Sequence, residues 1–553
     1  MTKSIHLTFF LLLVAVHVSE GCGGVEKEKK LCLQGEEEEC KCSNDQWGIR
    51  SCGPDGTWDD CVCHSAQPGG KPDDNINYDT DKDGDSEYEF DLDGSMDSGS
   101  DYPADASPDS TEDKCSYGPL AGGVTCTGAR LWMRTEEPAD VSFRYSEHED
   151  FHLSYLTPSQ QTSEDSDYTV VAKLSELKPD TIYYYTPRVN SEDIFRQNRP
   201  YFRTAPEPGR RSDFTFVILT DFQNALSPGT VQTYRSAHGA NPAFAIIGGD
   251  MDHRNPGKHQ KDLDYILFLT REMLRQNIDR NNERRRDFVD FILRKSSIAH
   301  QWDDHDFCCN DSDGTYIGKE MALKAYDEYF PSYDRPYPEK GIFQTWRWGH
   351  VHFILLDGRY NRTPSDQTDD EHKTMLGGLQ KEWLKQELRH SDAVWKIILS
   401  GSVFNPTVKC GADNWCEYRT EGKELTDFIN NQGIKNVVII SGDIHAGAIT
   451  DGTNSVYNTF WEMALPGADV IVPGCDTTTY RGRDKFGEWT HGTWGAGYRL
   501  MNPVKTCFGY GQVDVLTNPH RLVLSVRNEF GEVMLSAEVH ADTARRRGVW
   551  HPN

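Results

Sequence analysis

Acidic side chains follow apolar runs at five places in this 553-residue sequence, and at two of these places a histidine stands beside or close to them. These places are Asp221 after "FTFVILT", Asp250 after "AFAIIGG", Asp303-Asp304-His305-Asp306 after "SSIAHQW", Asp357 with Arg359 after "HVHFILL", and Asp443 with His445 after "NVVIISG". A single aspartate at such a place is usually a helix cap or a turn residue. Its recurrence after five runs is improbable as capping alone and indicates one shared site.

Carboxylates that meet without lysines repel one another, and bound cations are the simplest remedy. Aspartate oxygens with a minority of histidine nitrogens suit calcium, magnesium, manganese, iron or zinc, and do not suit a soft thiolate site. Two such ions about 4 Å apart can activate a water and hold phosphoryl oxygens for in-line displacement. The pattern therefore predicts hydrolysis of phosphate esters with two or more metal ions as cofactors.

The apolar runs are typical of strands buried on both faces of a parallel sheet. Amphipathic helices are predicted between them at "LDYILFLTREMLRQ", "GKEMALKAYDEYF", "LQKEWLKQELRHS" and "GKELTDFINNQG". Alternating strands and helices predict a layered α/β domain, whose ligand site lies beyond the carboxyl ends of the strands. All five acidic strand ends can therefore converge on one crevice.

A different pattern precedes this domain. Residues 115–208 contain short runs of alternating polarity separated by turn residues, which predict a small antiparallel β-sandwich. Within it, "LSELKPDTIYYYTPRV" resembles the corner and following strand of a fibronectin type III-like domain, which implies a structural or positioning role.

The motifs "LTDFQN", "IIGGDMDH", "WDDHDFCCND", "FILLDGRYNR", "MLGGLQKEWLKQEL" and "IISGDIH" are similar, in order and spacing, to those of the alkaline phosphatase D-like branch of the metallophosphoesterases. The resemblance spans about residues 116–540 and implies a metallophosphoesterase-type α/β sandwich, with the catalytic domain at 212–540. It implies metal-ligand roles for Asp221, Asp250, Asp304, Asp443 and His445, with Asp250 bridging two ions. It also implies that His305 protonates or orients the leaving oxygen, a role that suits the ordinary pKa of histidine.

The chain departs from that family at three ligand positions. At one of them, "LSGSVFNP" lacks the central histidine of many relatives, and Asn405 is a weak substitute candidate. "TDFQ" offers no thiol, and His253 stands where relatives commonly have a tyrosine after "GD". We interpret His253 as a ligand for a divalent ion, with an outer-shell role as the alternative. Arg359 is the second predicted catalytic residue, since its guanidinium can fork onto a phosphate; an ion pair that fixes the loop is the alternative.

The N-terminus has the layout of an exported protein. Residues 1–21 contain Lys3, the apolar "IHLTFFLLLVAV" and small residues at positions 19 and 21, which indicate a signal peptide. Cys22 is then either the lipidated cysteine of an envelope lipoprotein, tethering the chain to a membrane, or a residue near plain signal cleavage. Residues 22–70 predict a Cys-rich disulfide module, with zinc as the alternative, and residues 71–114 predict an acidic disordered linker.

The chain contains 15 cysteines, and without Cys22 the remaining 14 fall into even groups. In an oxidising compartment we expect the six cysteines of residues 32–63 to form disulfides with one another. The other expected pairs are Cys115 with Cys126, Cys308 with Cys309 (to each other or to other partners), Cys410 with Cys416, and Cys475 with Cys507.

The formal net charge of -29 argues against a nucleic-acid partner. We expect an exported phosphatase or phosphodiesterase, in the cell envelope or outside the cell, acting on small-molecule or polymeric phosphate esters. The alternatives are a phosphodiesterase directed at phospholipids or cell-wall polymers, and a non-catalytic surface binding protein that retains the fold. The sequence does not indicate the oligomeric state.

Overall fold

The computed structural model describes residues 116–227, 229, 231–255, 259–405, 413–452, 460–470 and 508–541, with the backbone of five further short strands. Contacts divide the chain into two units, Met1–Asp93 and Gly94–Asn553. In the first unit, β1 (Glu37–Lys41), β2 (Trp47–Ser51) and β3 (Val62–Cys63) form an antiparallel sheet. The predicted signal peptide, the predicted linker and most of the predicted Cys-rich module lie outside the described residues.

The second unit is built on two large sheets that pack face to face. The first has ten strands in the order β26-β25-β24-β23-β13-β14-β15-β4-β5-β9. Its parallel centre is β13 (Phe214–Leu219), β14 (Phe244–Ile247), β15 (Ser297–His300) and β4 (Leu120–Gly122). Antiparallel strands flank that centre: β5 (Ala129–Arg134), β9 (Thr169–Leu174), β23 (Gly509–Thr517), β24 (His520–Asn528), β25 (Val533–His540) and β26 (Gly548–Pro552).

The second large sheet has seven strands in the order β16-β17-β18-β19-β21-β20-β22. They are β16 (Gln344–Trp348), β17 (Val351–Leu355), β18 (Trp395–Ser400), β19 (Val437–Ser441), β20 (Ala448–Thr450), β21 (Trp461–Ala464) and β22 (Ala496–Gly497). Strands β17, β18, β19 and β21 run parallel. The Phe353 ring lies edge-on to Phe216 and Phe244 of the first sheet, at centroid distances of 5.1 and 5.3 Å, so the two sheets share one aromatic core.

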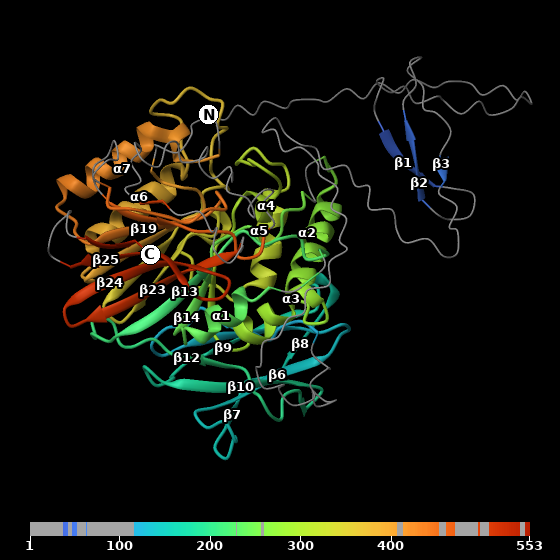
Figure 1. Cartoon of the computed structure of the whole chain (residues 1–553). Coiled ribbons are helices and arrows are strands. Elements are labelled where there is room, and N and C mark those ends of the chain that lie inside the picture. The colour runs from blue at the N-terminus through green and yellow to red at the C-terminus, as the bar shows by residue number, and fades with distance from the viewer. Residues whose placement is uncertain are drawn as a thin grey trace, which may run out of the picture. The chain divides into compact units, whose positions relative to one another are not determined.

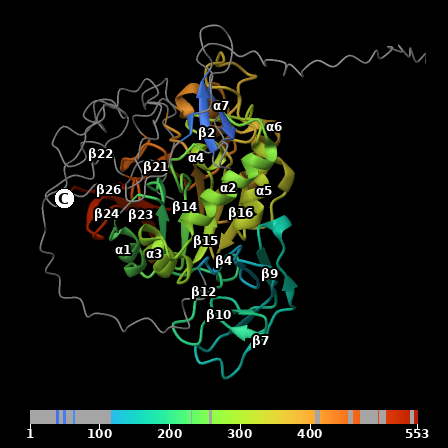
Figure 2. The same cartoon turned by 90° about the vertical axis from the view of Figure 1, so that its right-hand side faces the viewer.

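Helices cover the outer faces of both sheets (Figure 1, Figure 2). They are α1 (Thr233–Gly239), α2 (Leu263–Asn277), α3 (Glu283–Asp287), α4 (Asp304–Phe307), α5 (Lys319–Tyr329), α6 (Gly377–His390) and α7 (Arg419–Asn431). Leu384 of α6 and Leu425 of α7 pack on Ile398 and Ile439 of the second sheet, while α2 packs beside α5 on the other side. The predicted layered α/β fold is confirmed.

The region before β13 forms the predicted β-sandwich, but only one of its two sheets is separate from the rest of the unit. One is a separate six-stranded sheet of β6 (Asp140–Ser146), β7 (Tyr155–Leu156), β8 (Gln160–Gln161), β10 (Ile182–Val189), β11 (Glu192–Asp193) and β12 (Tyr201–Arg203). The other, β4-β5-β9, is the edge of the ten-stranded sheet, because β4 pairs in parallel with β15. The fibronectin type III-like character and the boundaries at 115–208 and 212–540 stay predictions.

Two of the predicted disulfides are not formed. Cys126, Cys308 and Cys309 are present as thiols, and the sulfurs of Cys308 and Cys309 are 3.0 Å apart, against about 2.05 Å for a bond. The Cys308 N–H donates to the Asp304 carbonyl at 2.7 Å, so Cys308 directly follows the last turn of α4 (Asp304–Phe307). Cys416 is disulfide-bonded. Cys115, Cys410, Cys475 and Cys507 lie outside the described residues.

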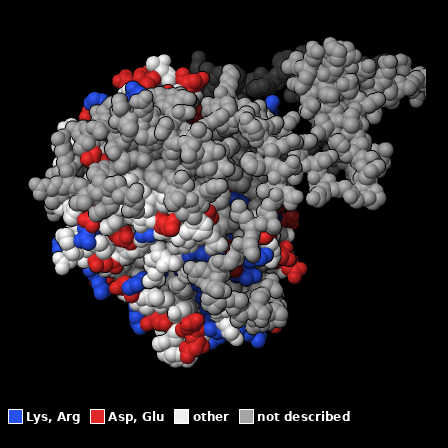
Figure 3. All heavy atoms as spheres, in the orientation of Figure 1, with Lys and Arg blue, Asp and Glu red and all other residues white. Residues whose placement is uncertain are grey.

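The described surface carries charges of both signs. On the face in Figure 3, acidic and basic side chains are interspersed wherever described residues are visible. Within the described part of the chain, every helix is too short or too polar to cross a bilayer.

Candidate metal centre and active site

Four of the predicted site residues lie at strand ends in a strained backbone conformation. Asp221 follows β13, Asp250 follows β14, and Asp443 and His445 follow β19, and all four have positive φ values, of 56°, 52°, 75° and 53°. Side chains other than glycine rarely occupy this left-handed region, and such strain gathers at functional sites. The strand ends are therefore shaped to aim particular side chains.

Glycines let these strand ends approach one another closely. A Cβ at Gly249, just before Asp250, would lie 2.8 Å from the Cβ of Asp303, and a Cβ at Gly401, at the end of β18, would lie 2.6 Å from Asp303 Oδ1. Both are too close for any side chain. The "GGD" and "SGS" motifs thus serve to bring strands of both sheets against Asp303.

The structure brings five of the six predicted ligands into two adjoining groups, and the sixth, Asp304, lies in another group with Asp311 and Asp413. Asp221, His253 and His445 form one group, which we call the nitrogen-rich subsite. Asp250, Asp303 and Asp443 form the other, which we call the oxygen subsite. In each group the possible ligand atoms lie within 4.8 Å of one another. Asp250 also lies within that distance of His253 and His305, so it stands between the two subsites, and its bridging role stays a prediction.

The nitrogen-rich subsite contains buried polar atoms that the protein leaves unsatisfied. Asp221 is fully buried, and neither of its carboxylate oxygens has a hydrogen-bond partner. Its Oδ1 lies 3.4 Å from His445 Nε2, which in turn lies 3.1 Å from His253 Nε2. Burial and the neighbouring His305 and His445 rings lower the pKa of His253 to about 3, so its imidazole is neutral at pH 7. A cation among these three side chains would satisfy all of them.

The oxygen subsite concentrates negative charge. Burial, followed by repulsion from Asp304 and Asp303, raises the pKa of Asp250 well above its usual range. The pKa of Asp443 is likewise raised well above its usual range, by burial first and then by repulsion from Asp303 and Asp304. When folding raises the pKa of a carboxyl, the free energy of unfolding falls as pH rises from the unfolded pKa to the folded pKa. At neutral pH this cluster therefore destabilises the fold unless a cation is present. The donor chemistry therefore fits bound metal ions.

Asp303 and Asp304 have different surroundings. Asp303 faces the oxygen subsite, and its Oδ2 has no hydrogen-bond partner. Asp304 instead accepts the backbone N–H groups of His305 (2.9 Å) and Asp311 (2.7 Å). Burial opposes ionisation of Asp304, yet Arg359 and His305 hold its pKa below its usual range. The ligand role of Asp304 stays a prediction, and Asp303 becomes a second candidate.

His305 lies beside Asp250, and its role as proton donor stays a prediction. It belongs to the short helix α4, it is 8% exposed, and its backbone N–H donates to Asp250 Oδ1 at 3.2 Å. Its Nδ1 has no hydrogen-bond partner. Asp306 holds α4 against the β14 loop, since its carboxylate accepts the backbone N–H groups of Asp250 (2.6 Å) and Met251 (2.9 Å). This positioning role of Asp306 was not predicted, although the residue lies in the quoted cluster.

Arg359 is fully buried, and its contacts are with protein groups. Its Nε donates to Asp303 Oδ1 at 2.5 Å, and its Nη1 pairs with Asp413 and donates to the Ser312 carbonyl at 3.2 Å. Its Nη2 donates to Ser402 Oγ at 3.3 Å. These contacts favour the alternative interpretation, an ion pair that fixes the site, over a fork on phosphate. Asp357 is likewise structural: it accepts N–H groups from Trp302, Ile342, Arg359 and Tyr360.

Replacing Arg359 with methionine is therefore expected to destabilise the fold. The change leaves Asp303 as a buried charge without its guanidinium partner, which costs about 3–5 kcal/mol, whereas Asp413 keeps its ion pair with Arg362. Urea unfolding of the metal-free protein measures this, with Arg286→Met, at an exposed arginine of α3, as the control. If Arg359→Met unfolds like the wild type and only raises KM for a phosphate ester, then Arg359 binds substrate.

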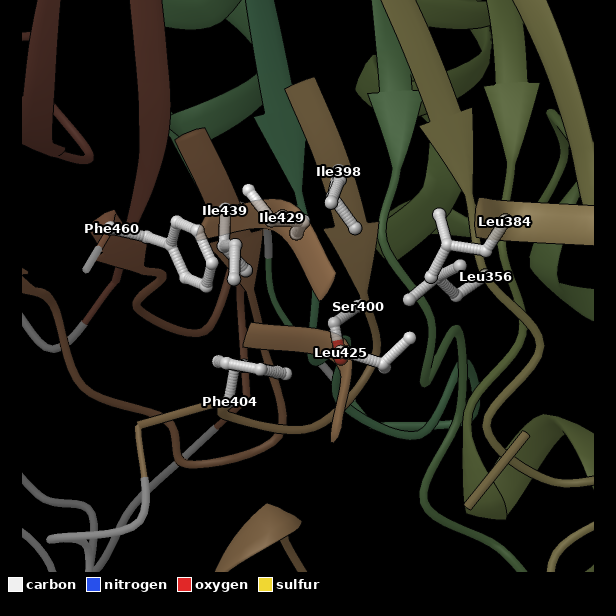
Figure 4. Close-up of a pocket in the computed structure, with 9 residues that line it drawn as sticks. All are labelled: Leu356, Leu384, Ile398, Ser400, Phe404, Leu425, Ile429, Ile439 and Phe460. Atoms are coloured by element: carbon white, nitrogen blue, oxygen red, sulfur yellow. The ribbon is translucent and has the colours of Figure 1, made fainter. Parts of the chain in front are cut away.

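A small cavity elsewhere in the unit is not a candidate for this chemistry. It lies between the second sheet and helices α6 and α7, and Figure 4 shows its lining of mostly aliphatic and aromatic side chains. Ser400 is the polar residue of that lining, and its hydroxyl is already bonded to the Ser402 carbonyl and the Trp415 Nε1–H. An anionic ester would lose its hydration there without compensation.

Comparisons with known proteins find related phosphatases. The family model "PhoD-like phosphatase" matches residues 224–472, and "PhoD-like phosphatase, N-terminal domain" matches residues 102–206. Together they cover more than half of the chain. The first match includes every predicted site residue except Asp221, which lies three positions before it.

Among curated proteins, the chain is 21% identical over 389 residues to alkaline phosphatase D of Bacillus subtilis (strain 168), covering 62% of this chain and 66% of that protein, just under two thirds of its length. Among solved structures, PhoD superposes with a TM-score of 0.65 at 17% identity, covering 81% of this chain and 94% of that one. A purple acid phosphatase from yellow lupin superposes with a TM-score of 0.50 at 14% identity, covering 77% and 74%. At these identities the two superpositions establish the shared fold.

Proposed function

Because the chain belongs to the PhoD-like phosphatase family, we propose that it is a metal-dependent phosphoric ester hydrolase whose centre comprises the nitrogen-rich and oxygen subsites. The observation that carries the proposal is the buried carboxylate of Asp221, without a hydrogen-bond partner, beside His445 and within one cluster of strand ends. A non-catalytic binding protein would have no need for such a cluster, because it destabilises the fold without cations.

The residues of the centre would have three kinds of role: binding metal, holding a proton and positioning a ligand. Asp221, His253 and His445 would hold one ion, Asp303 and Asp443 another, and Asp250 would contribute to both. Divalent ions bound there would supply Lewis-acid activation of water and neutralise charge on the phosphoryl oxygens. His305 would hold a proton for the leaving-group oxygen, with its backbone fixed to Asp250. Arg359 would keep Asp303 in place through the buried ion pair.

Removal of metal should abolish turnover and weaken the fold. We expect a strong chelator to reduce hydrolysis of an aryl phosphate to background and to lower Tm, because ions that bind only the folded state stabilise it by about 4 kcal/mol at a thousand times their Kd. Restoring divalent ions should recover both quantities. Calorimetry and initial rates measure this; a chelated, metal-free protein with undiminished turnover would exclude the proposal.

The substrate is either a phosphate monoester or a phosphate diester, and the diesters include phospholipids and cell-wall polymers. The formal net charge of -29 fits small esters better than a polyanion. Rates on a panel of mono- and diesters, in metal-replete buffer, identify the class. If the folded, metal-bound protein hydrolyses no ester of the panel, the alternative of a non-catalytic binding protein is favoured.

We also propose that the chain is exported. The apolar stretch after Lys3 and the cysteine-rich segment support this. A lipid on Cys22 would tether the enzyme to a membrane, and mass spectrometry of the mature N-terminus tests both points.

A further inference from the structure

A fully buried ion pair lies beside the loops that follow β13 and β14. It joins Arg285 of α3 to Asp469, which comes after β21 in the chain: Arg285 Nη1 donates to Asp469 Oδ2 at 2.8 Å, and neither side chain is exposed. Arg284 Nε donates to the same oxygen at 2.9 Å. Taking charges out of water is costly, and apolar side chains of similar volume often stabilise a fold at least as well. Stability alone therefore does not explain the pair.

The pair holds the loop after β13 through both backbone polar groups of one residue. Asp469 Oδ1 accepts the backbone N–H of Gln223 at 2.7 Å, and Arg285 Nη2 donates to the Gln223 carbonyl. The Arg285 guanidinium also lies over the Phe222 ring, 5.5 Å from its centroid. Hydrogen bonds to charged groups are shorter and stronger than those between neutral groups. The loop is therefore fixed just beyond Asp221.

Arg285 also reaches the loop after β14. Its Nη2 donates to the Met251 carbonyl at 3.4 Å, and its Nε donates to Asn277 Oδ1 at 2.9 Å. The Asn277 Nδ2 group donates in turn to Asp252 Oδ2 at 3.0 Å, and that oxygen accepts the Ala225 N–H at 3.1 Å. Arg285 is thus bonded directly to both loops, and Asn277 and Asp252 join them a second time.

Both loops begin with strained backbone that other groups must hold in place. Asp221 and Asp250 have φ values of 56° and 52°, and such backbone persists only where the surrounding structure determines it. The loops meet where the Phe222 N–H donates to the Asp250 carbonyl at 2.6 Å. A movement of Gln223 would therefore pass through Phe222 to Asp250 as well as to Asp221.

We propose that Arg285 and Asp469 are positioning residues: the pair sets the spacing of the loops after β13 and β14, and with it the placement of Asp221 against Asp250. Asp469 lies outside every group of possible metal ligands in the described part of the chain, so the pair acts through the loops. The proposal rests on the proposed function, because the spacing matters to turnover only if the two carboxylates take part in chemistry.

Arg285→Lys tests the pair without leaving a buried charge alone. Lysine keeps the positive charge, but its single ammonium cannot reproduce the planar fork that reaches Asp469 and both loops together. Asp469 keeps its ion pair with Arg284, at 2.9 Å. We expect kcat for 4-nitrophenyl phosphate to fall about tenfold to a hundredfold, as a small misplacement of reacting groups causes, with little change in KM. Arg286→Lys, at the neighbouring exposed arginine, should match the wild type.

Two measurements that do not depend on turnover accompany the rates. Calorimetric titration of Zn²⁺ into the chelator-treated full chain should show at least about tenfold weaker binding by Arg285→Lys than by the wild type. Urea unfolding of the same metal-free proteins should differ little, because the charge balance of the pair is kept. Arg285→Met, which removes the charge as well, should lose at least as much turnover and Zn²⁺ affinity.

Wild-type kcat and Zn²⁺ affinity in both variants would overturn the positioning role. A loss of turnover no larger than the loss of folded protein would also overturn it, because the pair would then only stabilise the fold. An inactive wild type would instead contradict the proposed hydrolase, and the Zn²⁺ titrations would still decide whether Arg285 places the ligands.

Discussion

Asp250→Asn is expected to release metal from both subsites and to reduce kcat/KM by at least about a thousandfold. Asp250 stands between the nitrogen-rich and oxygen subsites, within ligand distance of Asp303 and Asp443 on one side and His253 on the other. Asparagine has nearly the same shape but removes the negative charge and offers only one oxygen. Each subsite therefore loses a shared donor, whereas any other single ligand change affects one of them.

Elemental analysis and initial rates on an aryl phosphate test this expectation. The same measurements on Asp264→Asn, an exposed aspartate in the first turn of α2, should give wild-type values. The metal-free fold of Asp250→Asn should be more stable than that of the metal-free wild type, because one repelling charge is gone. A variant with full metal content and undiminished turnover would contradict the bridging role.

His305→Ala is expected to keep its metal and lose turnover by about a hundred- to ten-thousandfold, the usual contribution of a general acid. The loss should depend on the ester. A leaving group of low pKa, such as 4-nitrophenolate, departs without a proton, so its rate should fall less than that of an alkyl phosphate. A uniform loss over all leaving groups would mean that His305 positions other residues and does not transfer a proton.

The metal content of His305→Ala separates two roles that the geometry allows. His305 lies within ligand distance of Asp250 and His253, so it could bind an ion directly. Loss of one equivalent of metal from His305→Ala would identify it as a ligand and contradict its assignment as proton donor. Retention of both ions with slow turnover of alkyl esters supports the assignment.

Local sequence determined the elements that carry the site. Strands β13, β14, β17, β18 and β19 and helices α2, α5, α6 and α7 all lie within a few residues of their predicted positions. Apolar runs and helical periodicity depend on neighbouring residues alone, so they are readable without the fold. The same holds for the acidic strand ends, because parallel strands in layered sheets end at one edge. The hairpins β23–β25 went unpredicted, although "HRLVLSVRN" alternates in polarity as a half-buried strand does.

Tertiary structure alone decided which atoms meet. Asp303 lies within ligand distance of Asp250, and Asp304 Oδ1 shares the His305 N–H with Asp250 Oδ1, and no periodicity specifies either contact. The burial of Arg359 between Asp303 and Asp413 joins residues 56 and 54 positions apart in sequence. The facing of His253 and His445 joins residues 192 positions apart. Contacts of this kind depend on the register of two sheets and on left-handed backbone at the strand ends, and both arise from packing across the whole unit, which short stretches of sequence do not encode.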